Sequence, residues 1–457
     1  MSDYLPSTPA QRQDMLDELG YKDVGDLYSA IPENLLLQEL DLPEGISELE
    51  LTRLIQSLAD KNVVFPSIFR GGGAYYHFIP ALVKSTASKE EFVSAYTPYQ
   101  AEISQGILQS IFEYQTMVCE LTGMDVSNAS LYDGATSAAE AVLMCQERKR
   151  SKVVVSQTLN PQWIEVVQTY CESRDVELIV IPSENGATDI SAFEAALDES
   201  CACALFQHPN YFGVLEDPDA LIRAAHDKGA KAIMATEPTS LGILKTPGEL
   251  NADICVCEGQ PLGIPLSFGG PYLGIITCTK ALTRKLPGRI VGQTIDSDGN
   301  RAFVLTLQAR EQHIRREKAS SNVCSNQALC ALIAGSYLAC MGPDGISDVA
   351  QQSYAKAQYA AEKICAVEGF SLAFDQPFFN EFVSYYHGDI QALETYLAKQ
   401  GILSGLPLML DSSGHLCNDS ARICANAILW CTTEMNTKEE IDALVSALKT
   451  FATEASK

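Results

Sequence analysis

The feature that most constrains this fold is a regular alternation of short apolar runs and helical segments between residues 130 and 280. The runs are nearly continuous in apolar, often β-branched residues: KVVVSQ, VELIVIP, ACALFQ, AKAIMAT, ADICVC and LGIITC. The segments between them, such as NPQWIEVVQTYCES and PDALIRAAHDKG, carry apolar residues at helical spacing. Uninterrupted apolar strands separated by helices predict a mostly parallel sheet with helices on both faces. Ligands in such folds bind beyond the carboxyl ends of the strands, so the loops there are the candidate site.

The chain has 457 residues, more than one hydrophobic core usually serves, so we expect more than one domain. We predict an N-terminal helical arm over 1–68 and a large α/β domain over 69–310. Linking helices and a small C-terminal α+β domain then occupy 311–457.

Local signals support this division. In the arm, Thr8 can cap a helix that starts at Pro9 and stops at Gly20. In the C-terminal part, long helices near 308–341 and 347–368 precede strand-like segments SLAF, EFVSYY and ANAILWCT. The last helix is expected from Thr437 onward.

Composition excludes several classes of protein. The net charge is -26 and no block of Lys or Arg is present, which argues against nucleic-acid binding. The apolar runs are far shorter than the roughly 20 residues of a membrane span, and the N-terminus lacks the pattern of a signal peptide. We therefore expect a soluble, cytoplasmic protein without a nucleic-acid or membrane partner.

The fifteen cysteines point to a reducing compartment rather than to metal binding. None has C-x-x-C spacing, and no His/Cys cluster accompanies them. Cys201 with Cys203, and Cys255 with Cys257, are spaced to share one face of a strand, where they pack as small hydrophobes. No metal site is expected.

Two of the strand ends resemble half of a cofactor site. AKAIMATEP ends in Glu237, and ADICVCEGQP ends in Gln260. In pyridoxal-phosphate (PLP) enzymes of the aminotransferase-like class, an acidic residue after one strand contacts the pyridine nitrogen, and a lysine after a later strand forms a Schiff base. Glutamine cannot form that bond, and the nearest lysines, Lys245 and Lys280, do not lie at the tip of the loop.

The segment SLYDGATSAAEAVLMC (130–145) has two interpretations. It is a turn that leads into a helix, with Gly134 and Thr136 at the turn and with Ser137 and Glu140 spaced as a capping box. Amides at such a helix start can bind phosphate. The alternative is an ordinary capped helix, because Asp133 would repel a phosphate.

Longer motifs cover nearly the whole chain: GGGAYYHFIP, YTPYQAEISQGILQSIFEYQTMVCELTGM, HPNYFGVLED, EGQPLGIPLSFGGPYLG, RKLPGRIVGQTIDSDGNRAFVLTLQAREQHIRREKASSNVCSNQAL and PFFNEFV. With them the chain resembles the P-protein, or glycine decarboxylase, family of the glycine cleavage system, in particular the first (α) subunit of its two-subunit form. In the family's second subunit the loop H-K-T-F-x-x-P-H-G-G-G-G-P holds PLP, and its lysine aligns with Gln260. Glu237 departs from the aspartate that is common in the family.

The resemblance implies a fold type I, PLP-dependent transferase-like architecture, with a large, mostly parallel seven-stranded sheet and a smaller C-terminal α+β domain. It also implies an α2β2 oxidoreductase, glycine dehydrogenase (aminomethyl-transferring). The second subunit would hold PLP, and together the chains would decarboxylate glycine and transfer its aminomethyl group to the lipoyl group of H-protein. This chain would supply one wall of the shared site. The alternatives are a non-catalytic scaffold or regulatory subunit and, less favoured, an independent enzyme that uses another lysine such as Lys245.

The resemblance also selects candidate residues. For the catalytic wall we predict Tyr96, Tyr99, Gln100 and Glu102, although a surface loop before a helix would look the same. Substrate or interface contacts are predicted for Tyr75, Tyr76, His77, Arg310, His313 and Arg316, the alternative for the last three being a helix face with ion pairs. The degenerate cofactor pocket is predicted to comprise Gln260, Glu237, Gly134 and Thr136.

Overall fold

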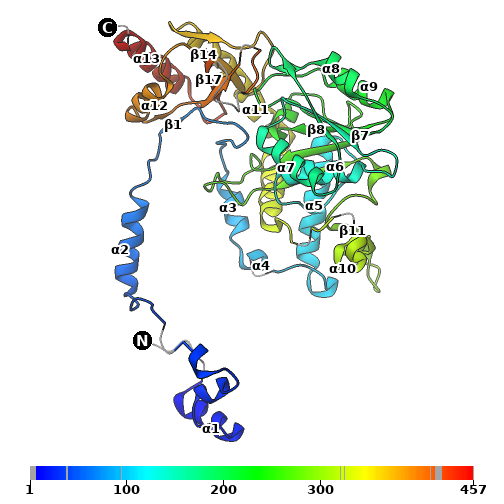
Figure 1. Cartoon of the computed structure of the whole chain (residues 1–457), viewed down its shortest axis with the longest axis vertical. Helices are drawn as coiled ribbons and strands as arrows, with labels where there is room; N and C mark the ends of the chain where they lie inside the picture. The colour runs from blue at the N-terminus through cyan, green and yellow to red at the C-terminus, as the bar shows by residue number, and fades with distance from the viewer. Residues whose placement is uncertain are drawn as a thin grey trace. The chain divides into compact units, whose positions relative to one another are not determined.

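The computed structural model describes residues 7–37, 40–93, 95–319, 321–323, 325–411, 413–416 and 425–455. Its two compact units are Met1–Val64 and Phe65–Lys457 (Figure 1).

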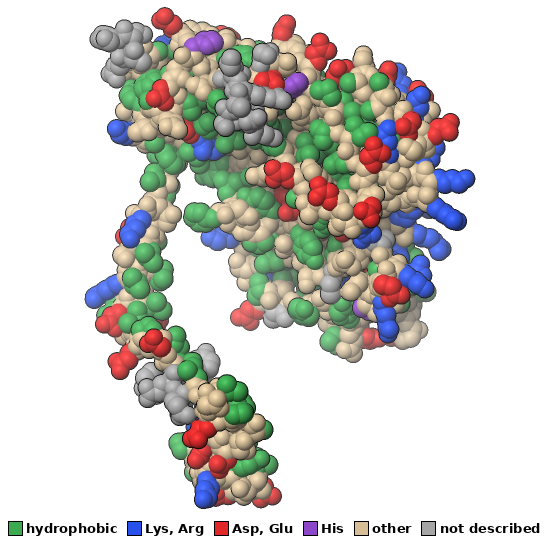
Figure 2. Space-filling view, viewed as in Figure 1, with side chains coloured by type: hydrophobic (Ala, Val, Ile, Leu, Met, Phe, Trp, Pro, Cys, Tyr) green, Lys and Arg blue, Asp and Glu red, His purple; other side chains and the backbone are tan. Residues whose placement is uncertain are grey.

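The first unit consists of short helices, as predicted for the arm. Helix α1 (Pro9–Leu19) is capped by the Thr8 side chain and ends at Gly20, which has a φ of 76°. The unit's other elements are η1 (Val24–Tyr28), η2 (Glu33–Leu35) and α2 (Glu48–Ala59). Helix α2 exposes a row of apolar side chains: Leu49, Leu51, Leu54, Ile55 and Leu58. Hydrophobic groups are visible along the surface of this unit (Figure 2).

The second unit is built on a seven-stranded sheet in the order β2-β10-β9-β8-β7-β3-β4. Strands β9, β8, β7, β3 and β4 are parallel, whereas β10 is antiparallel to both β9 and β2. All six predicted runs form strands. The two-residue edge strand β2 was not predicted, because so short a segment has no detectable periodicity. The bounds are β2 (Val126–Ser127), β3 (Lys152–Ser156), β4 (Leu178–Ile181), β7 (Cys201–Gln207), β8 (Lys231–Thr236), β9 (Ile254–Glu258) and β10 (Gly274–Cys278).

Helices cover both faces of this sheet, as expected for buried parallel strands. Helices α6 and α7 share a core with one face, and α8 and α9 pack on the other. Helices α5 and α11 cover the same second face of the sheet at β9 and β10. The bounds are α5 (Gln105–Thr122), α6 (Gly134–Cys145), α7 (Pro161–Glu172), α8 (Ile190–Ala196), α9 (Pro218–Asp227) and α11 (Ala328–Cys365).

The two cysteine pairs behave differently. Cys255 and Cys257 lie on one face as predicted, with their sulfur atoms 3.6 Å apart. For Cys201 and Cys203 the prediction is wrong, because the register against β3 shifts between them and leaves Ala202 as an extra residue. Such a bulge reverses the alternation of faces, so the two side chains join opposite cores.

Of the two long helices predicted near 308–341 and 347–368, only the start at residue 308 is wrong. The segment forms three short turns, η6 (Gln308–Arg310), α10 (Gln312–Arg315) and η7 (Arg316–Lys318). Leu307 and Arg316 each have a φ of 54°, a left-handed conformation that a helix cannot contain. The long helix is α11, which begins at Ala328 and bends at Gly342 and Pro343.

By length and composition, α11 could cross a membrane. In this fold it packs against α3 (Ala81–Ala87), α5 and α13 (Lys438–Ala455), with Tyr337, Ala360 and Ile364 fully buried. It is therefore a core helix of the second unit.

The C-terminal part contains a four-stranded antiparallel sheet in the order β13-β14-β17-β16. Helices α12 and α13 pack on it together with α11. The bounds are β13 (Phe370–Leu372), β14 (Glu381–Tyr386), α12 (Ile390–Lys399), β16 (Leu406–Leu410), β17 (Ala425–Cys431) and α13 (Lys438–Ala455). Smaller elements are β1 (Ser67–Ile68), α3 (Ala81–Ala87), α4 (Glu90–Val93), η3 (Ala101–Ile103), β5 (Ser183–Glu184), β6 (Ala187–Thr188), η4 (Pro238–Gly242), η5 (Lys280–Leu282), β11 (Ile290–Ile295), β12 (Arg301–Thr306) and β15 (Ile402–Leu403).

Candidate functional site

The candidate site residues form two groups in the second unit, and each group joins predicted residues to residues that were not predicted. The first, which we call the buried cluster, comprises Tyr75, His77, Glu237, Glu258, Gln260 and Glu381. The second, which we call the wall, comprises Tyr96, Tyr99, Gln100, Glu102, Arg289 and His313.

Gln260 is at the centre of the buried cluster and is 2% exposed. Its side-chain oxygen accepts a hydrogen bond from the Tyr75 amide at 2.8 Å, and its nitrogen donates to the carbonyls of Tyr75 at 3.0 Å and Ile264 at 2.8 Å. The amide therefore ties the glycine loop before Tyr75 to the loop after β9. A lysine has no acceptor atom and cannot make this pair of opposed bonds.

Glu258, the last residue of β9, was missed by the sequence analysis. Its carboxylate lies at the start of α6. Its carboxylate accepts bonds from the amides of Gly134 at 2.9 Å, Leu273 at 3.0 Å and Gln260 at 3.1 Å. Burial raises the pKa of Glu258 to about 7. The sequence feature that could have identified Glu258 is its place at the carboxyl end of a buried strand, the same feature that singled out Glu237.

The predicted capping box of Ser137 and Glu140 is wrong, because α6 begins one turn earlier. Asp133 is the N-cap, and its carboxylate accepts from the Thr136 amide at 2.7 Å. Asp133 and Glu258 accept hydrogen bonds from the amides of Thr136 and Gly134, to which a phosphate would otherwise bind. This favours the alternative of an ordinary capped helix.

Glu237 faces its own turn rather than an open pocket. It accepts bonds from the Thr239 amide at 3.0 Å, the Thr239 hydroxyl at 2.6 Å and the Ser240 amide at 2.8 Å, and burial raises its pKa. The cavity that Glu237, Glu258 and Tyr75 line has about 30 Å³, room for one or two waters, whereas ligand pockets usually exceed about 300 Å³. The residues here do not fit a pyridoxal cofactor, since the lysine, the anion site and the space are all lacking.

The glycine loop is fixed by two further acids that were not predicted. Glu381 accepts from the Tyr75 hydroxyl and from the Gly72 amide, both at 2.7 Å, and Glu434 contacts His77 Nδ1 at 2.7 Å. Burial raises the pKa of Tyr75 well above its usual range and that of Glu381 to about 7. Tyr75 and His77 thus face inward, whereas the Tyr76 side chain is exposed.

The raised pKa of Glu381 predicts a specific pH dependence. The folded chain keeps this proton up to about pH 7 while the unfolded chain loses it near its ordinary pKa of 4.5, so folding stability falls as pH rises between these values. In Glu381→Gln the unfolding free energy should fall about 2 kcal/mol less from about pH 5 to about pH 7.5. Urea unfolding at both pH values measures this.

The control for that measurement is Glu439→Gln, at an exposed position of α13, which should follow the unchanged chain. Parallel curves for Glu381→Gln and the unchanged chain would contradict the assignment.

The wall brings three distant segments together. The Tyr99 hydroxyl accepts a bond from Arg289 Nη2 at 3.0 Å, and the guanidinium carbon lies 5.2 Å from the centre of the same ring. The His313 ring meets Tyr99 edge-on at 6.0 Å. Arg310 donates to the Gly288 carbonyl at 3.0 Å and so holds the backbone next to Arg289.

The remaining wall candidates point to solvent. Tyr96 is 85% and Tyr99 51% exposed, and Gln100 and Glu102 are exposed as well. Arg316 is exposed in η7, and among the described residues no hydrogen bond or ion pair joins its side chain to the wall. Arg289 was missed although it lies in the quoted motif RKLPGRIVG, because only the fold shows its burial.

The family model described as "Glycine cleavage system P-protein" matches residues 2–448. The chain belongs to the P-protein family. The resemblance drawn from the motifs is confirmed.

Full-length relatives carry one name. The chain is 48% identical over 448 residues to "Probable glycine dehydrogenase (decarboxylating) subunit 1" of Moorella thermoacetica, covering 98% of this chain and 99% of the relative. It is 47% identical to the protein of that name from Desulfitobacterium hafniense, with 97% and 99% covered. A crystal structure of glycine decarboxylase (P-protein) of the glycine cleavage system, in inhibitor-bound form, superposes with a TM-score of 0.89 at 39% identity, covering 98% of this chain and 99% of that one.

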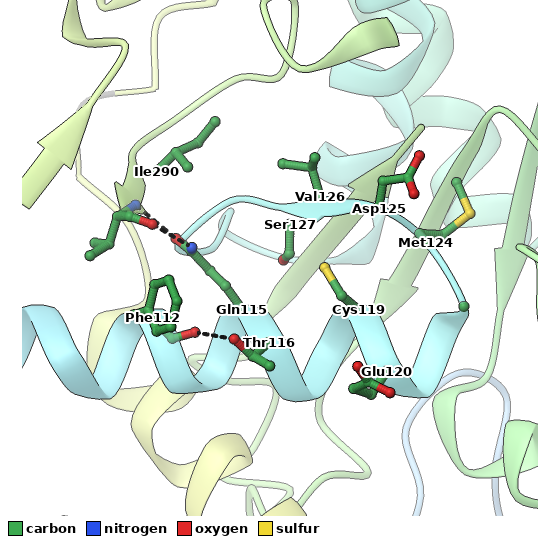
Figure 3. A pocket seen from close by; sticks show the side chains of 12 residues that line it. Phe112, Gln115, Thr116, Cys119, Glu120, Met124, Asp125, Val126, Ser127 and Ile290 are labelled. Atoms are coloured by element: carbon green, nitrogen blue, oxygen red, sulfur yellow. Dashed lines mark hydrogen bonds between the residues drawn. The ribbon is translucent and has the colours of Figure 1, made fainter. Parts of the chain in front are cut away.

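This P-protein chain also has a groove of about 620 Å³ between α5 and the segments that hold β2 and β11 (Figure 3). Cys119 points from α5 toward β2, and burial raises its pKa to about 11, so the thiol stays protonated. None of the predicted site residues lines the groove. Within the described residues no group of three or more His, Cys, Asp or Glu could hold a metal ion.

Proposed function

We propose that this P-protein chain is subunit 1 of a two-subunit glycine decarboxylase and supplies one wall of an active site seated in subunit 2. The main observation behind this proposal is the Gln260 side chain. Its amide makes three hydrogen bonds at the position where a PLP-binding chain needs a free lysine. PLP would be held by the partner and not covalently by this chain. The names of the full-length relatives support the division into subunits.

The proposal includes the architecture, the assembly and the location of the protein. The chain would have a fold type I transferase-like architecture with domains at 69–310 and 311–457, and it would form a cytoplasmic α2β2 assembly. The complex would decarboxylate glycine and transfer the aminomethyl group to the lipoyl group of H-protein.

The wall is the part of this chain that can reach such a shared site. Tyr96, Tyr99 and Glu102 are exposed and therefore available to a partner, while Arg289 and His313 hold the Tyr99 ring from behind. Their roles would be to orient glycine, exclude water and hold a proton at Glu102. Tyr76, exposed on the glycine loop, is a further candidate for the interface.

A reconstitution experiment tests the division of labour. The purified full chain should show no visible absorbance band of a pyridoxal–lysine adduct and no exchange of bicarbonate into glycine. Addition of subunit 2 should produce both signals. Exchange by this chain alone, or a borohydride-reduced adduct on one of its lysines such as Lys245, would refute the proposal.

The scaffold alternative is supported by the cavity of the buried cluster, which at about 30 Å³ is smaller than a cofactor requires. In that case subunit 2 would need this chain for assembly only, and changes in the wall would leave turnover intact.

A further inference from the structure

Arg289 is a buried cation with incomplete pairing. The residue is 6% exposed, and the only described hydrogen bond of its guanidinium runs from Nη2 to the Tyr99 hydroxyl. Its Nε is buried and has no partner. No carboxylate oxygen of the described residues lies within 4.0 Å of its guanidinium, although the chain carries 58 Asp and Glu.

A buried charge without a counter-charge destabilises the fold, because the charge loses its hydration. A neutral hydroxyl and a ring face offset only part of that cost. Arginine presents its donors as a planar fork that fits two oxygens of a carboxylate or phosphate. The missing partner of Arg289 is therefore an oxyanion.

The structure places Arg289 in a pocket that can admit one. The pocket has about 230 Å³ and lies between α4, the 95–98 loop, α5 and the start of α11. Its polar lining includes Arg289, Ser110, Ser325 and Asn326, and the exposed Tyr96 is at its rim. The hydroxyls and the amide can donate to further oxygens, and Ile107 and Leu332 are among the apolar residues of the lining.

We propose that Arg289 and this pocket bind an oxyanion, either the carboxylate of a small amino acid or a phosphate monoester, at the shared active site. The place of this pocket in catalysis depends on the proposed function, whereas oxyanion binding by the chain itself does not. Two residues predicted from the sequence lie next to this anion site. The Tyr99 hydroxyl accepts a hydrogen bond from Arg289, and Arg310 donates to the carbonyl of Gly288, the residue before Arg289.

Thermal unfolding of the full chain tests binding directly. At constant ionic strength, inorganic phosphate or acetate should raise Tm with concentration, compared with chloride. Arg289→Gln should abolish the rise. Asn326→Asp, which keeps the shape and adds a carboxylate to the pocket, should weaken binding by about tenfold or more without loss of fold.

The matched control is Arg284→Gln, at an exposed position five residues away, which should keep the full rise in Tm. Equal anion effects in all variants, or no rise with either anion in the unchanged chain, would overturn the proposal.

The reconstituted complex distinguishes the two sources of the anion. If the pocket binds the glycine carboxylate, Asn326→Asp should raise KM for glycine about tenfold or more with PLP affinity unchanged. If it binds the cofactor phosphate, the same variant should weaken PLP binding and leave KM unchanged. Unchanged values for both would overturn the catalytic role. A failure of the unchanged chain to assemble with subunit 2 would instead contradict the proposed function and leave the anion binding measured above standing.

Discussion

Gln260→Lys lowers the unfolding free energy of this chain by about 4 kcal/mol and does not create a PLP-binding subunit. The substitution removes the acceptor of the Tyr75 amide and puts an ammonium group into a site that is 2% exposed. The side chain has no route to a cofactor, because the adjoining cavity has about 30 Å³. The expected result is a weakened fold rather than a gained activity.

Urea unfolding gives the change in stability, and absorbance after incubation with PLP gives the adduct. Gln293→Lys, at an exposed position of β11, is the control and should stay within about 0.5 kcal/mol of the unchanged chain. A stable Gln260→Lys chain with a visible adduct band would show that the pocket is open after all.

The second large effect is expected in the wall. In the reconstituted complex, Glu102→Gln should reduce the glycine–bicarbonate exchange rate by about 100-fold, the usual range for the loss of a proton-transferring group. Tyr99→Phe should reduce kcat/KM as well, because it removes the hydroxyl that Arg289 holds at 3.0 Å. Glu102 is exposed in the chain by itself, so Glu102→Gln should not disturb folding, whereas Tyr99→Phe also removes a hydrogen bond of the buried Arg289, so its stability is measured alongside its activity.

Two matched variants make this result interpretable. Glu113→Gln on α5 and Tyr354→Phe on α11 replace exposed residues of the same types and should leave the rates within about twofold. Co-elution with subunit 2 confirms assembly for each variant. Unchanged exchange rates in Glu102→Gln and Tyr99→Phe would support the scaffold alternative.

Much of the fold could be predicted from the chain because its signals are local. Six apolar runs separated by helical segments specify the central sheet, and Thr8 and Gly20 mark the ends of α1. The errors occurred where backbone conformation overrides the pattern of side chains. Left-handed residues at 307 and 316 divide an apparent helix, and the bulge at Ala202 moves Cys201 to the opposite face.

The candidate site was less predictable, because its chemistry arises from burial. Glu237 and Gln260 follow their strands as expected, but Glu381 contacts Tyr75, and Arg289 contacts Tyr99, across long stretches of sequence. An arginine in RKLPGRIVG looks like any surface cation until the fold removes it from water.

The Glu258 carboxylate at the start of α6 has one more consequence. The helix that could serve a dissociable phosphate is already neutralised by a group that the polypeptide brings with it. The amides at this helix start are paired without any bound anion, so we expect this chain to fold without added phosphate or pyridoxal phosphate.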